Sequence, residues 1–260
     1  MSTRLTFFGA AGYEIVSPSH RILIDPFLSE NPSAPVQPDE LETPDVILVS
    51  HAAFDHLGDT AAIAKRTGAP VVCDGGVRQL LIDQGVDGDL VQATTWGIVT
   101  EVAGIVIRPV ECHHWSAAQL SNGDWAMGNP IAFIVETEPG TRIYHYGDTS
   151  VFDMSLLGEL YRPTVGLLGC TVPHELLDRV PGPGRFLTGE MDADEAARVA
   201  EMLGLEIAVA CHYLEADEEV ERFLSLVPKY DTTGTRKAVA PKVGETLVIE
   251  GASFEIEAAA

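Results

Sequence analysis

Short apolar runs bounded by turns occupy the start of the chain. They lie at residues 5–8, 13–16 and 21–24, and glycine or proline-serine turns separate them. Runs of this length and spacing are typical of β-strands. A proline-rich stretch over residues 31–44 predicts a loop, and the continuous apolar run over 46–49 predicts a buried strand.

Helical patterns and apolar runs alternate in the rest of the chain, except for a β-like middle part over residues 90–146. The further predicted strands cover residues 71–73, 165–170, 207–211, 246–249 and 253–256. The predicted helices cover residues 59–67, 77–84, 153–161, 193–203 and 218–226.

This order of elements predicts an α/β fold. Two β-rich stretches are each followed by strands that alternate with helices, which favours two mixed sheets packed together with helices outside. The sequence contains no fixed-period repeat and no linker, so we expect one domain over residues 1–260.

The charge balance narrows the expected partners. The chain has 16 basic and 39 acidic residues, a formal charge of −23. Such a field repels phosphate backbones and anionic lipids, so we expect a small-molecule substrate and neither nucleic acid nor a membrane as partner. The alternative explanation is a solvated acidic surface that aids solubility. Because the sequence shows no membrane-span run and no signal-peptide core, we expect a cytoplasmic protein, and a homo-oligomer stays open.

One turn carries a concentrated set of ligand-type side chains. In the segment SHAAFDHLGD, His51 directly follows an apolar strand, and Asp55 and His56 come four and five residues later. Imidazole and carboxylate groups are the usual ligands of zinc and other divalent first-row metals. The alternative for this turn is ordinary helix capping, with Asp59 at the start of the next helix.

Three more strand ends carry similar residues. His113 and His114 end the run RPVEC, Asp148 ends RIYHYG, and His212 ends EIAVAC. Each alone is explained as a packed histidine or a helix cap. Because the carboxyl ends of strands in layered α/β proteins form one edge, the set together favours a metal site there.

These motifs resemble the metallo-β-lactamase superfamily, and more narrowly its branch of ascorbate-6-phosphate lactonase and related metal-dependent hydrolases. The resemblance spans roughly residues 5–213 and rests on LTFFGAAGYEI, ILIDP, SHAAFDHLGD, HHWS, IYHYGDTS and EMDADEAARVAEMLG. It implies an αββα sandwich with one or two divalent metal ions at one sheet edge. Zinc and manganese are the expected ions, and iron is the alternative.

The resemblance also implies a role for each residue. The implied metal ligands are His51 and His114 for a first ion, Asp55, His56 and His212 for a second, and Asp148 between the two. Asp25, in LIDP, is expected to orient a histidine from behind.

One position departs from the family's His-x-His-x-Asp-His pattern. Ala53 stands where the second histidine is expected. We therefore expect the second site to fill readily, and the first to bind weakly or to recruit His113 as a substitute ligand.

The implied activity is hydrolysis of a cyclic ester or amide by metal-activated water, with Asp55 or Asp148 taking up the proton. His174 and Arg185 lie in an irregular segment that is a candidate substrate lid, so both are candidate substrate contacts, and an ordinary surface loop is the alternative. Two other functions stay open. One is hydrolysis of a small phosphodiester, and the other is a non-catalytic binding protein with a degenerate metal site.

Overall fold

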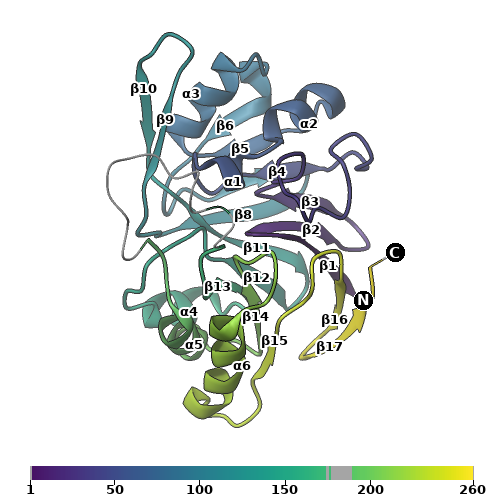
Figure 1. The fold of residues 1–260 in the computed structure, drawn as a ribbon, viewed down its shortest axis with the longest axis vertical. Helices are drawn as coiled ribbons and strands as arrows, with labels where there is room; N and C mark the ends of the chain where they lie inside the picture. Colours follow the sequence, from purple (N-terminus) through teal and green to yellow (C-terminus); the bar gives the residue numbers. More distant parts are fainter. Residues whose placement is uncertain (1, 174–175, 177–188, 260) are drawn as a thin grey trace.

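Two β-sheets lie face to face in the computed structural model, and helices cover their outer faces (Figure 1). The structure describes residues 2–173, 176 and 189–259. This layer order, αββα, confirms the fold that the sequence predicts.

The first sheet is mixed. Over the described residues its strands run in the order β17 (Ser253–Glu257), β16 (Thr246–Glu250), β1 (Thr3–Gly9), β2 (Gly12–Val16), β3 (Arg21–Ile24), β4 (Val46–Leu48), β5 (Val71–Cys73) and β6 (Val91–Ala93). The strands from β17 to β3 pair antiparallel, and those from β3 to β6 pair parallel.

The second sheet is also mixed. Its strands run in the order β15 (Lys237–Val239), β14 (Ile207–Cys211), β13 (Val165–Gly169), β12 (Thr141–His145), β11 (Ala132–Glu138), β8 (Ile105–Val110) and β7 (Thr100–Val102). The strands from β12 to β15 are parallel. A separate hairpin of β9 (Ser116–Gln119) and β10 (Trp125–Gly128) stands beside the first sheet's helices (Figure 1).

The period-two pattern of the strands builds two cores. In β3, Ile22 and Ile24 face the second sheet, whereas Leu23 faces the helices. β4 divides in the same way, with Ile47 on the helix side. Because side chains alternate across a strand, a fully apolar run is what a sheet covered on both faces requires.

Helices cover each sheet, and all but the short α1 and η1 lie where the sequence predicts them. The helices α1 (Phe54–Leu57), α2 (Thr60–Thr67) and α3 (Gly75–Asp83) belong to the first sheet, with the short η1 (Gly88–Leu90) after them, and α4 (Ser155–Tyr161), α5 (Ala193–Met202) and α6 (Glu218–Tyr230) cover the second. The predicted helix over residues 77–84 begins earlier, at Gly75, because the Asp74 carboxylate accepts a hydrogen bond from the Val77 N–H at 2.8 Å.

The last helix is longer than predicted. The predicted helix ends at Leu226, but α6 continues through Pro228 to Tyr230. The Tyr230 hydroxyl donates to Asp194 at 2.6 Å, and Arg198 lies over the Tyr230 ring. These contacts with α5 hold the last turn despite the backbone donor that proline lacks.

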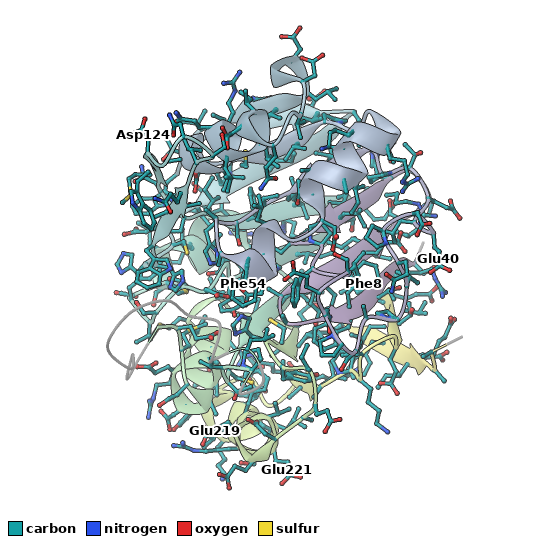
Figure 2. All side chains as sticks on the ribbon, turned by 45° about the horizontal axis from the view of Figure 1, so that its top comes forward. Phe8, Glu40, Phe54, Asp124, Glu219 and Glu221 are labelled. Atoms are coloured by element: carbon teal, nitrogen blue, oxygen red, sulfur yellow. The ribbon has the colours of Figure 1, made fainter. Side chains whose placement is uncertain are left out.

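Acidic side chains are spread over the surface. Glu40, Asp124 and Glu221 are exposed and lie on separate margins of the molecule (Figure 2). No helix in the described part of the chain is long and apolar enough to cross a membrane.

Candidate metal centre

Ligand-type side chains follow four strands at one edge of the sandwich. Asp25 follows β3 and His51 follows β4 in the first sheet, and Asp148 follows β12 and His212 follows β14 in the second. The neighbouring strands β3 and β4, and likewise β12 to β14, are parallel. Their carboxyl ends therefore meet at the same edge, which brings residues far apart in the sequence together.

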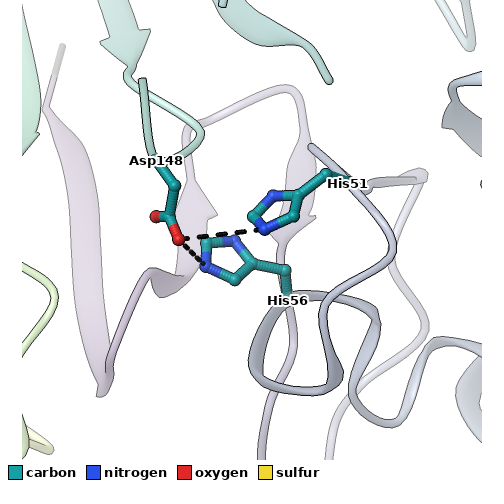
Figure 3. A group of neighbouring side chains, drawn as sticks. All are labelled: His51, His56 and Asp148. Atoms are coloured by element: carbon teal, nitrogen blue, oxygen red, sulfur yellow. Dashed lines mark ion pairs between the residues drawn. The ribbon is translucent and has the colours of Figure 1, made fainter. Parts of the chain in front are cut away.

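Asp148 lies at the middle of the cluster. Its Oδ2 is 3.0 Å from Nε2 of His56, 3.5 Å from Nε2 of His212 and 3.8 Å from Nε2 of His51. Figure 3 shows the His51 and His56 rings turned toward this carboxylate. A carboxylate oxygen that faces three imidazole nitrogens from both sheets is well placed to share an ion with them.

Asp55 adds a second carboxylate from α1, the single helical turn after His51. Asp55 Oδ2 lies 3.5 Å from Nε2 of His212. The ligand-type atoms of Asp55, His56 and His212 lie within 4.8 Å of one another, as do those of His51, His56 and Asp148. Such spacing allows one ion to contact all three members of a group.

The His51 side of the cluster has fewer such groups. The rings of His51 and His114 are 4.7 Å apart, and His114 donates from Nδ1 to the Gly189 carbonyl at 2.7 Å, which leaves its Nε2 for another partner. Burial and the neighbouring His56 lower the pKa of His51 well below its usual value, so this ring is neutral. Ala53 stands at the N-terminus of α1 and has no group to add.

Several buried atoms in the cluster lack hydrogen-bond partners. Among the described residues these are Nε2 of His51, His56 and His212 and Oδ1 of Asp148. Each unsatisfied buried polar atom costs about 1–3 kcal/mol. Four of them pointing at one place fit a bound cation, because imidazole nitrogens and carboxylate oxygens are the donors that a divalent first-row ion takes.

The net charge of the cluster also fits a cation. Four buried carboxylates, Asp25, Asp55, Asp148 and Glu190, gather among the histidines. In the part of the chain that the structure describes, no lysine or arginine is paired with any of them. Buried carboxylates of this number need positive charge close by.

Without a metal, protons on two histidines supply that charge. Burial lowers the pKa of His56, but the carboxylates of Asp148 and Asp25 outweigh it and hold this pKa well above its usual value. Burial likewise lowers the pKa of His212, and Asp148 and Glu190 raise it further than burial lowers it. A cation at the cluster therefore competes with these protons.

Asp25 holds His56 from behind. Its Oδ2 accepts a hydrogen bond from Nδ1 of His56 at 2.7 Å. The Ser50 N–H and hydroxyl donate to the same carboxylate at 2.8 and 2.6 Å. This network assigns the proton of His56 to Nδ1 and turns its Nε2 toward Asp148.

Glu190 is a member that the sequence prediction missed. Its Oε1 lies 2.6 Å from Nδ1 of His212, and burial raises its pKa to about 7. It is the first residue of the motif EMDADEAARVAEMLG, but it follows no predicted strand, and a glutamate just before a helix cap carries no recognisable signal of this role.

Two other described histidines, His113 and His145, are not among the candidate ligands that the structure brings together. His113 is exposed, pairs with Glu111 at 2.7 Å and stacks on Phe152, so the structure does not bring it into the cluster. His145 is buried, and its Nε2 lies 2.9 Å from the Ala11 carbonyl and 3.8 Å from Asp25. His174 and Arg185 lie outside the described residues.

Known proteins resemble the chain over most of its length. A family model described as a Beta-lactamase superfamily domain matches residues 20–213. A UPF0173 metal-dependent hydrolase of Rubrobacter xylanophilus is 36% identical over 214 residues, which cover 81% of each protein. One from Archaeoglobus fulgidus is 34% identical over 257 residues, 97% of this chain and 98% of the relative.

Solved structures share the architecture. Igni18, a metallo hydrolase from the archaeon Ignicoccus hospitalis, superposes with a TM-score of 0.74 at 25% identity and covers 96% of this chain and 99% of its own. The metallo-β-lactamase fold protein YhfI of Bacillus subtilis reaches a TM-score of 0.66 at 14% identity over 95% of this chain and all of its own (100%), a likeness of fold alone.

Proposed function

The chain belongs to the metallo-β-lactamase superfamily of metal-dependent hydrolases, and on that premise we propose that it opens a cyclic ester or amide, a lactone or a lactam, in a small neutral molecule. The observation that carries the choice of substrate is an uncharged pocket at the sheet edge that also carries the histidine cluster.

This pocket is open and has a volume of about 510 Å³. Its described lining comes from Gly75, from the residues after β6 and from the end of β10, and none of it is charged: Gly75, Ala93, Thr94, Thr95, Ile98, Met127, Gly128 and Asn129. In a chain of net charge −23, an uncharged wall favours a neutral, partly apolar ligand over a phosphate.

The pocket lies at the same edge of the first sheet as the turn that carries His51. β5 and β6 lie beyond β4 in the parallel part of the first sheet, so their carboxyl ends share its edge. Gly128 pairs across the hairpin with Ser116, whose hydroxyl accepts a hydrogen bond from the Ala52 N–H at 3.1 Å. We propose that a substrate in this pocket extends along this edge, so that its scissile bond lies at the cluster.

We propose that Asp55, His56, Asp148 and His212 hold one divalent ion, and that His51 and His114 with Asp148 form a weaker second site. A divalent ion there supplies Lewis acidity, which polarises the scissile carbonyl and makes an attacking water easier to deprotonate. Zinc and manganese suit this mixed donor set, with iron as the alternative.

The Asp148 and Asp55 carboxylates have different roles in this proposal. Asp148 faces three Nε2 atoms and is committed to them. Within the described part of the chain, Asp55 forms an ion pair only with His212, and its side chain is slightly more exposed than that of Asp148, so Asp55 is the better proton acceptor. As the water oxygen bonds to the carbonyl carbon and the ring bond breaks, Asp55 takes the water proton and returns it to the leaving oxygen or nitrogen.

The test is a substrate panel with elemental analysis of the purified protein. We expect bound zinc, manganese or iron, and hydrolysis of at least one uncharged lactone or lactam. Faster turnover of bis-p-nitrophenyl phosphate than of every lactone and lactam would overturn the substrate proposal. Protein that takes up no metal, and has no activity after zinc or manganese is added, would instead indicate a non-catalytic binding protein.

A further inference from the structure

We propose that Glu190 is a positioning residue for the metal centre: it accepts the Nδ1 proton of His212 and so directs Nε2 of that ring at the ion. The inference rests on the proposed metal site. Glu190 Oε1 lies 2.6 Å from Nδ1 of His212, and both side chains are buried, with 5% and 4% exposed. His212 has its Nε2 on the opposite side of the ring, 3.5 Å from Asp148 and from Asp55.

Glu190 is itself held rigidly. Its other oxygen, Oε2, accepts a hydrogen bond from the Tyr146 hydroxyl at 2.7 Å. Tyr146 is fully buried, and its phenol fills the space where a side chain at position 169 would stand. A Cβ on Gly169 would lie 2.2 Å from the Tyr146 hydroxyl oxygen, so the glycine is what admits this phenol.

The arrangement repeats the one behind His56. Asp25 accepts from Nδ1 of His56 at 2.7 Å and is fixed by Ser50, as Glu190 accepts from His212 and is fixed by Tyr146. A carboxylate behind a metal-ligating imidazole fixes its tautomer and orientation and makes it a stronger donor. The two histidines nearest Asp148 therefore have the same kind of support, from different segments of the chain.

The ligand-type atoms of Glu190, Asp148 and His212 lie within 4.8 Å of one another, so Glu190 could also contact an ion directly, but that role fits it less well. Its Oε1 already pairs with Nδ1 of His212, and its Oε2 accepts a hydrogen bond from Tyr146. A neutral acceptor also lies near the same imidazole, because the Thr171 carbonyl is 3.2 Å from Nδ1 of His212. Removing Glu190 should therefore weaken His212 as a ligand without freeing its ring completely.

The experiment measures metal affinity directly. Metal-free wild type, Glu190→Gln and Glu190→Ala are titrated with zinc in competition with a chelator, and with cobalt while the visible absorption is recorded. We expect zinc affinity to fall about 10- to 100-fold in Glu190→Ala and less in Glu190→Gln, which keeps an acceptor. The cobalt spectrum should shift in both variants, because the donor strength of His212 changes.

Glu138→Gln is the matched control. Glu138 is also buried, at the end of β11, and is absent from the residue groups that could hold an ion among those described. Its zinc affinity and cobalt spectrum should equal those of the wild type. Tyr146→Phe, which removes only the hydroxyl, supplies a second test if Glu190→Ala does not fold, and should lower zinc affinity by a smaller factor.

Two results would overturn the inference. Wild-type affinity and spectrum in the folded Glu190 variants would show that His212 needs no carboxylate. A fall in zinc affinity well beyond 100-fold in Glu190→Gln, with a lower coordination number for the cobalt that still binds, would make Glu190 a ligand. A wild-type protein that binds neither zinc nor cobalt is a different failure, because it refutes the metal centre itself.

Discussion

Gly169 ends β13 beside the ring of Tyr146, and one added methyl group there should disturb the metal centre from behind. A Cβ at position 169 would lie 2.2 Å from Cζ and from the hydroxyl oxygen of Tyr146, whereas ordinary contacts begin at 3.4 Å. The phenol must therefore move by about 1.2 Å, the difference between these two distances. O–H···O bonds span only about 2.5–3.0 Å, so such a shift breaks the 2.7 Å bond to Glu190.

Two quantities should change in Gly169→Ala. Overpacking a core costs about 1–3 kcal/mol, so the free energy of unfolding of the metal-free protein should fall by that amount. Zinc affinity should fall by up to about 10-fold, because Glu190 loses one of its two anchors. Chemical denaturation and chelator competition measure the two effects separately.

Gly166→Ala, on the same strand, is the control. A Cβ there would meet the end of the Leu205 side chain at 2.3 Å, so this variant should lose stability but bind zinc normally. In the background of Tyr146→Leu, which removes the colliding atoms, Gly169→Ala should cost much less than in the wild type. The reasoning is refuted if Gly169→Ala matches the wild type in both measurements, or if its cost is the same in both backgrounds.

Three further predictions concern the same centre and its scaffold. Zinc affinity should fall as the pH falls through the raised pKa values of His56 and His212, because below these values both rings must release a proton to bind metal. Chelator competition across a pH series measures this, and an affinity independent of pH would contradict it. Ala53→His should strengthen the site on the His51 side, so elemental analysis should find more metal per chain, and an unchanged ratio would show that another group already completes that site. Phe223→Ala removes a fully buried ring of α6 and should lower the free energy of unfolding by about 3–5 kcal/mol, whereas the folded variant should keep its zinc affinity. Chemical denaturation measures the loss, and a loss below about 1 kcal/mol would contradict the observed packing.

The layers could be predicted because several central strands, β4, β13 and β14 among them, are apolar on both faces. The run over residues 46–49 cannot be an amphipathic helix or an exposed strand, and the structure buries every residue of β4. The positions of the candidate ligands follow from the same logic, since a polar residue directly after such a strand lies at the sheet edge. Sequence reasoning could therefore find Asp148 and His212 without knowing the order of the strands.

Short and irregular pieces could not be predicted in the same way. The helix α1 is one turn long, too short for a helical period, yet it carries Asp55 and His56. β15 has three residues and depends on its pairing with β14. Glu190 shows the limit most clearly, because its role depends on its 2.6 Å contact with His212, and no local pattern encodes a contact between segments.

Backbone conformation at the cluster is a further feature that sequence does not reveal. Asp25, Asp148 and His212 have φ values of 46°, 63° and 67°, in the left-handed region that costs a non-glycine residue about 1–2 kcal/mol. Ala10, with φ of 49°, exchanges backbone hydrogen bonds with the segment of His212: the His212 N–H donates to the Ala10 carbonyl at 2.7 Å, and the Ala10 N–H to the Tyr213 carbonyl at 3.0 Å. These bonds join the end of β1 in one sheet to the end of β14 in the other, so they fix His212 relative to the first sheet.

Strained residues persist only where their surroundings determine them, and here these backbone bonds and the carboxylates behind His56 and His212 do so. The ligand set is therefore held by the fold of both sheets, and a substitution that loosens their junction at Ala10 should weaken metal binding as surely as one in the ligands.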